Sequence, residues 1–113
     1  MSRPPLHGGP HAARVTRRIS ASAERVYDAF LAHGIERRGA YVEQVPARRL
    51  AFQEEPNAYA GPEPRPIVVE LVAIGDACEV TVTDWVWDAD NDFHATVAWW
   101  SKRLDELASA LHE

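Results

Sequence analysis

The strongest constraint on the fold of this chain is an apolar stripe near its C-terminus. Its six members recur at spacings of 4, 3, 4, 3 and 4 residues: Phe93, Val97, Trp100, Leu104, Leu107 and Leu111. Because an α-helix has about 3.6 residues per turn, these spacings put all six side chains on one helical face. The pattern predicts a C-terminal helix of about 18 residues that buries this face against another element.

Segments of alternating apolar and polar residues predict a sheet whose apolar face can pack against this helix. Apolar and polar residues alternate in segments 14–19, 40–45, 49–54, 67–73 and 79–87, which predicts five strands. The short linkers PAR and IGDA predict two β-hairpins, and the proline-rich segment 55–66 predicts a loop. A short helix is expected at 23–33, between a Ser22 N-cap and a Gly34 stop. The expected class is therefore α+β, with a curved antiparallel sheet of about five strands, a short N-terminal helix and a long C-terminal helix packed across the sheet.

Composition narrows the class of protein. With 113 residues the chain has the size of one domain, and we expect a flexible tail at 1–12 and a single domain at 13–113. The net charge of -5 argues against nucleic acid as a partner. The chain contains a single cysteine, Cys78, which suits a reducing cytoplasm, and it has no apolar run long enough for a signal peptide or a membrane span. We expect a cytoplasmic protein, and the excess of arginine over lysine suggests a bacterial one.

Four segments resemble a known family in the same order along the chain. VTRRISASAERVYDAFL resembles the opening of the START-like or SRPBCC superfamily, which has the helix-grip fold. GAYVEQVPARRLAF, PIVVELVAIGDACEVTVT and WWSKRLDELASAL are similar to later segments of one of its branches, the activator of heat-shock-protein-ninety ATPase homologues. The resemblance spans residues 14–111. It implies the helix-grip fold, and it suggests ligand carriage or docking on a chaperone ATPase as functions.

One departure from the family pattern bears on both functions. Between the first helix and GAYVEQV this chain has only AHGIERR, where relatives have a further helix and strand. A loss of about thirty residues there would remove one wall of the family's cavity and leave residues 40–45 as a new sheet edge.

The resemblance places a pocket between the C-terminal helix and the sheet. An apolar small molecule bound without catalysis is the first functional hypothesis, and a filled core built from the same side chains is its alternative. The residues expected to line this region are Leu50, Phe52, Val69, Leu71, Val80, Val82, Phe93, Val97 and Trp100.

The second hypothesis is a protein-interaction module. If the strand at 79–87 keeps its alternation, Trp85 and Trp87 point away from the helix, and an apolar patch of this kind marks a contact surface. A bulge at Asp84 would instead turn both tryptophans into the pocket mouth. Together with Tyr41 on the new edge, these residues form the expected interface, with a homodimer as one outcome.

Catalytic and metal-binding motifs are weak. DADNDF lacks the glycine and glutamate of a calcium loop, so its acids are interpreted as helix caps. His94 could act as a general base with Asp84 and Tyr41 nearby, but the sequence has no nucleophile elbow and no phosphate loop. We expect no metal, no cofactor and no catalytic residue, so the sequence does not predict an enzyme.

Overall fold

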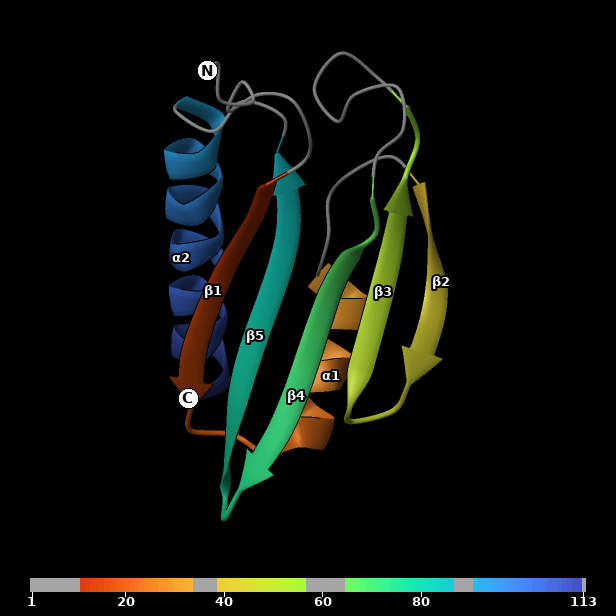
Figure 1. The fold of residues 1–113 in the computed structure, drawn as a ribbon. Helices are drawn as coiled ribbons and strands as arrows, with labels where there is room; N and C mark the ends of the chain where they lie inside the picture. The colour runs from red at the N-terminus through yellow and green to blue at the C-terminus, as the bar shows by residue number, and fades with distance from the viewer. Residues whose placement is uncertain (1–10, 34–38, 57–64, 87–90, 113) are drawn as a thin grey trace, which may run out of the picture.

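The computed structural model describes residues 11–33, 39–56, 65–86 and 91–112, and it has the expected α+β architecture. The elements in chain order are β1 (His11–Ile19), α1 (Ala23–His33), β2 (Gly39–Val45), β3 (Arg49–Glu54), β4 (Ile67–Ile74), β5 (Ala77–Val86) and α2 (Asn91–His112). Figure 1 shows the strands as one sheet with both helices behind it.

The five strands pair antiparallel in the order β1-β5-β4-β3-β2. The first strand therefore lies beside the last one, and β1 and β2 form the two edges. Val82 is opposite Val15 of β1 and Val69 of β4, and Val69 is opposite Leu50 of β3. This register aligns apolar side chains from four strands on the side of the sheet that carries the helices, which we call the helix-covered face. The opposite side is the open face.

The two hairpin turns use backbone geometry suited to their sequences. Gly75 has φ of 59° and begins the two-residue turn between β4 and β5, as a type II′ turn requires. Between β2 and β3 the carbonyl of Val45 accepts a hydrogen bond of 3.0 Å from the backbone N–H of Arg48. Pro46 precedes Ala47, whose φ of 62° matches the position that glycine usually occupies in a type II turn.

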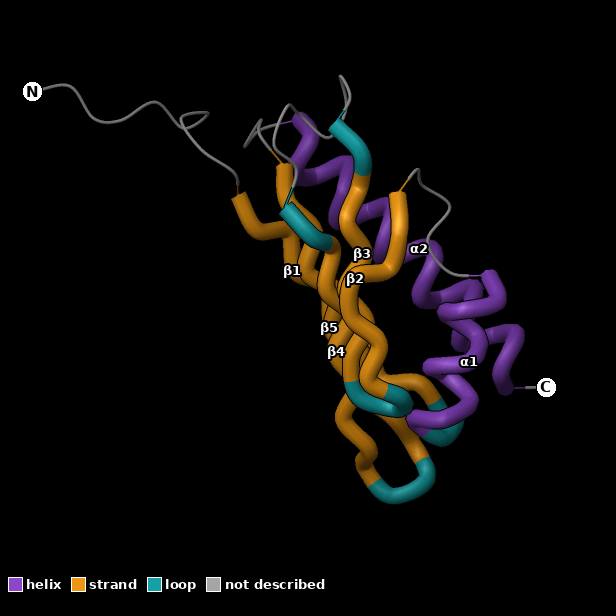
Figure 2. The backbone as a smooth tube through the Cα atoms, turned by 90° about the vertical axis from the view of Figure 1, so that its right-hand side faces the viewer, coloured by secondary structure: helices purple, strands orange, loops and turns teal. Residues whose placement is uncertain are grey.

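The helices divide the helix-covered face between them. Helix α2 packs against β1 and β5, whereas α1 packs against β4 and β5 and touches α2 (Figures 1 and 2). The hydroxyl of Ser22 accepts a hydrogen bond of 3.3 Å from the backbone N–H of Arg25, which is the N-cap expected for α1. The bounds of α1 match the prediction, while α2 is longer than predicted, with 22 residues.

Strand β1 begins earlier than expected. His11 and Ala12, which the sequence places in the tail, pair with Val86 and Trp85 of β5. The remainder of the expected tail, residues 1–10, lies outside the described residues.

Candidate functional site

The residues expected to line a pocket form the centre of the hydrophobic core. Seven of the nine belong to one cluster of buried side chains, and Val97 packs against it at half-burial. Phe93 lies near the start of α2 and is also half-buried, with its ring perpendicular to that of His94 at a centroid distance of 5.9 Å. The buried seven are Leu50, Phe52, Val69, Leu71, Val80, Val82 and Trp100.

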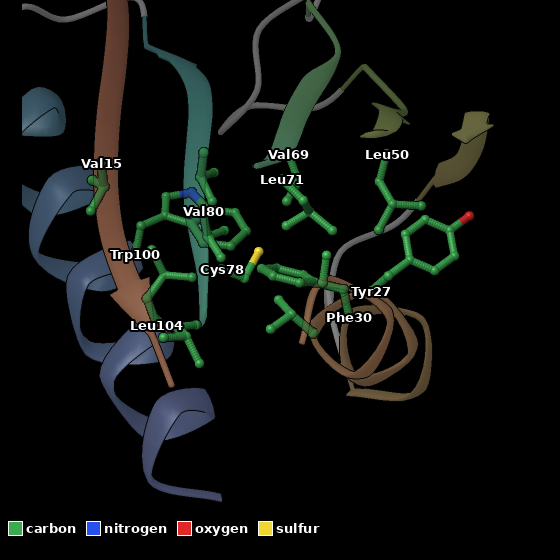
Figure 3. Close-up of a cluster of buried hydrophobic side chains, with 14 of the residues drawn as sticks. Val15, Tyr27, Phe30, Leu50, Val69, Leu71, Cys78, Val80, Trp100 and Leu104 are labelled. Carbon is green, nitrogen blue, oxygen red and sulfur yellow. The ribbon is translucent and has the colours of Figure 1, made fainter. Parts of the chain in front are cut away.

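These side chains pack against both helices. Leu50, Val69, Val80 and Val82 are each 0% exposed, as expected of a close-packed interior. In Figure 3 the strand side chains point toward Tyr27 and Phe30 of α1 on one side and toward Trp100 and Leu104 of α2 on the other. This arrangement agrees with the filled-core alternative; a ligand pocket at these positions stays a prediction.

A buried carboxylate joins the sheet to α2. Asp84 is 2% exposed and lies on the helix-covered face of β5. Its Oδ2 accepts a hydrogen bond of 2.9 Å from Nε1 of Trp100, and its Oδ1 accepts one of 2.7 Å from the backbone N–H of Trp85. Burial of the carboxylate is tolerated because N–H groups satisfy its oxygens. Asp84 is thus a structural partner of Trp100, while His94, its expected neighbour in catalysis, is exposed.

The alternation of β5 is preserved through Asp84. Strands β1 and β5 pair from His11↔Val86 to Ile19↔Cys78 without a register shift, so the alternative bulge at Asp84 does not occur. Trp85 therefore lies on the open face, as the sequence predicts for an unbroken strand. Its ring is half-buried, with the guanidinium carbon of Arg65 5.1 Å from a ring centroid. Trp87, the other tryptophan of the expected interface, lies outside the described residues.

Tyr41, the third residue of the expected interface, turns toward the core. Its hydroxyl donates a hydrogen bond of 3.3 Å to the carbonyl of Phe30, and its ring meets Phe52 edge-on at 5.4 Å between centroids. Burial raises the pKa of Tyr41, and nearby Tyr27 raises it further. Because Tyr41 faces the core, the exposed surface of this edge is formed by the other residues of β2.

Strand β2 is the exposed edge that the sequence predicts at 40–45. Six of its seven residues are exposed, and no described strand pairs with its outer side. The register shifts between Tyr41 and Glu43, which leaves Val42 as an extra residue in a β-bulge, with 60% of its surface exposed. The single charged residue of the strand, Glu43, accepts a hydrogen bond of 2.6 Å from Nε of Arg49.

The outer side of α2 carries a shallow hollow of about 670 Å³, lined by Ala98, Ser101, Lys102, Asp105, Glu106 and Ser109. It lies on the opposite side of the helix from the predicted pocket. Within the described residues, no cluster of His, Cys, Asp and Glu side chains could hold a metal ion, and no helix is long and apolar enough to cross a membrane.

Comparison with known proteins identifies the fold. No family model and no curated protein matches the chain. Among solved structures, the Aha1 dimer from Colwellia psychrerythraea has a TM-score of 0.74 at 18% identity, covering 89% of this chain and 96% of the other. An AHSA1-like protein from Rhizobium etli has a TM-score of 0.71 at 14% identity, covering 88% and 81%. A protein from Chromobacterium violaceum has a TM-score of 0.67 at 19% identity, covering 90% and 98%.

These similarities confirm the fold expected from the sequence. The chain has the helix-grip fold of Aha1-like proteins, with a five-stranded antiparallel sheet and its C-terminal helix packed on one face.

Proposed function

We propose that this chain is a non-catalytic interaction module that binds a second copy of itself through β2. The observation that carries the proposal is the exposure of this edge, where six of seven residues face solvent and Val42 is 60% exposed. An edge strand offers unpaired N–H and C=O groups to another strand, so an exposed edge with little charge favours association. The proposed interface is isologous, with β2 of each copy antiparallel to the other.

Side chains near β2 would add apolar area to the proposed interface. The hydrogen bond from Tyr41 to the Phe30 carbonyl holds the last turn of α1 against β2. The next residue in that turn, Leu31, is 40% exposed. Because the bulge at Val42 interrupts the ladder, a dimer cannot rely on a long run of backbone pairs. Burial of Val42 and Leu31 would contribute the apolar area that the short ladder lacks.

The fold of the neighbours is compatible with this assembly. The structure from Colwellia psychrerythraea is described as a dimer. For the present chain we propose a homodimer in a reducing cytoplasm, where the buried thiol of Cys78 stays out of disulfides.

Two valines with similar exposure test the proposal. Val42 is 60% exposed on the edge strand β2, and Val72 is 56% exposed on the interior strand β4. We expect Val42→Asp to shift the protein to monomer in sedimentation velocity, because two buried carboxylates would meet near the symmetry axis. Val72→Asp should associate like the unmodified chain. A monomeric unmodified protein, or equal association by both variants, would reject self-association through β2.

Binding of an apolar small molecule is the second candidate. It is favoured by Val97 and Phe93, which are only half-buried although they continue the stripe of Trp100. In native mass spectrometry, a retained apolar adduct that Val97→Trp removes would support it. In a filled core, the same substitution should instead destabilise the fold by about 1–3 kcal/mol through overpacking.

A further inference from the structure

The side chains flanking β2 contain a charge arrangement that self-association does not by itself require. Arg49 of β3 donates from Nε to Oε1 of Glu43 at 2.6 Å and from Nη1 to Oε2 of Glu70 at 3.2 Å. Arg49 lies directly opposite Glu70 and diagonal to Glu43 in the register, so all three share the open face. One arginine thus connects the edge strand to two interior strands.

The ion pair with Arg49 offsets the negative charge that Glu43 places on the exposed edge β2. Glu43 is the single charged residue of GAYVEQV, and Arg49 is its partner. In an isologous β2 pair, both copies of Glu43 would approach the same symmetry axis, about 7–8 Å apart if they sit diagonally across the seam. Two uncompensated carboxylates at that separation would repel each other.

We propose that Arg49 favours self-association, because its positive charge offsets that of Glu43 at the edge. The occupant of the surface is a second copy of this chain, so the inference rests on the proposed function. Arg49 acts through Glu43 and need not touch the partner. Its guanidinium can hold two carboxylates at once, which suits it to this position better than lysine.

The test compares three variants by sedimentation equilibrium at low salt. Arg49→Gln should weaken association by about tenfold, since like charges then meet across the seam. Combining Arg49→Gln with Glu43→Gln should restore it. Glu70→Gln, the matched control, removes the other partner of Arg49 without changing the charge of β2, so the dissociation constant should stay the same or fall. Added salt should reduce the Arg49→Gln defect, because it screens exposed charges.

The outcomes separate this role from structural support. If Arg49→Gln associates as tightly as the unmodified chain, or if Glu43→Gln fails to restore the double variant, charge neutralisation by Arg49 is rejected. The same conclusion holds if Glu70→Gln is as defective as Arg49→Gln, because loss of sheet support would then explain both. Val42→Asp distinguishes the two proposals: if it disrupts the dimer while Arg49→Gln does not, association through β2 stands and the role of Arg49 falls.

Discussion

The two edges of the sheet differ in how they meet solvent. Strand β1 carries Arg14, Arg17 and Arg18 with no acidic residue, and α2 packs against it. Arg17 also pairs with Asp105 of α2 at 3.2 Å. Strand β2 carries one charged residue, Glu43, which is paired with Arg49, and an exposed valine in a bulge. Because repeated charge and a covering helix oppose edge-to-edge pairing, β1 is protected and β2 is available.

The difference shows how one sheet can have one protected edge and one accessible edge. The N-terminal strand is placed beside β5, under the C-terminal helix, so its exposure is limited by the fold itself. The opposite edge, β2, ends the sheet, and no described strand pairs with its outer side. Its behaviour is therefore set by a few side chains, which makes it accessible to single substitutions.

The largest effect on stability is expected at the hydrogen bond between Trp100 and Asp84, which holds α2 on the sheet beside β1. Trp100→Phe removes the N–H donor of the buried Asp84 and part of the packing under α2. We expect a loss of about 2–3 kcal/mol in the free energy of unfolding, measured by urea denaturation. Trp99→Phe, at the preceding position and 36% exposed, is the matched control and should cost less than about 0.5 kcal/mol. Similar losses in both variants would mean that the hydrogen bond to Asp84 does not account for the loss of stability.

Adding a positive charge to β2, like those on β1, should reduce the difference in self-association between the two edges. Gln44→Arg adds a positive charge to the exposed edge strand. It should weaken self-association by about tenfold without lowering monomer stability, because the two arginines repel across the seam. Glu79→Arg, on interior strand β5, is the control and should leave the association constant close to that of the unmodified chain. Light scattering over a concentration series measures both.

A smaller effect is expected at the turn that leads out of β2. Ala47 has φ of 62°, a conformation that costs a residue with a Cβ atom about 1 kcal/mol. Ala47→Gly should raise the unfolding free energy by about 0.5 kcal/mol, since loss of the methyl contact with the core offsets part of the gain. Ala73→Gly, in strand β4 where positive φ does not occur, should lower it instead. Thermal unfolding compares the two variants.

The smallest effect is the contribution of Tyr41, on the β2 side, to the pH dependence of stability. Burial, then nearby Tyr27, raises the folded-state pKa of Tyr41, so the neutral phenol is preferred in the fold. The corresponding stability is fully present below the ordinary tyrosine pKa of about 10 and is lost as pH rises through the higher folded value. Tyr41→Phe should flatten the fall in unfolding midpoint between about pH 9 and 11. Parallel curves for the two proteins would contradict this assignment.

Sequence periodicity was sufficient for the type and order of the elements and for most side-chain directions, but not for the start of β1 or the length of α2. The predicted bounds of α1 are those observed, and the alternation that places Trp85 away from α2 holds because β1 and β5 pair without interruption. The stripe through Trp100 and Leu104 is buried as its spacing requires. These features depend on local geometry, which a single sequence records directly.

The candidate site depends on contacts that periodicity does not encode. Alternation shows that Asp84 and Val82 share a face, but not that the indole of Trp100 is positioned to bond the carboxylate. A lone aspartate in a buried strand, with a tryptophan N–H requiring a partner, was a signal that could have suggested this pair. At Tyr41 the bulge adds a residue to β2, so the inward direction of its side chain follows from pairing with Phe52 and not from spacing alone.

The placement of β1 beside β5 also sets the order in which the strands can pair during folding. Arg14 and its hydrogen-bond partner Thr83 are 69 residues apart, so the first strand gains its neighbour only after the four later strands have left the ribosome. Until then β1 has no strand to pair with, whereas β2, β3 and β4 can already form a sheet from strands that are close in sequence. Closing this long loop is entropically costly before its contacts form, so docking of β1 should be the slow step in folding.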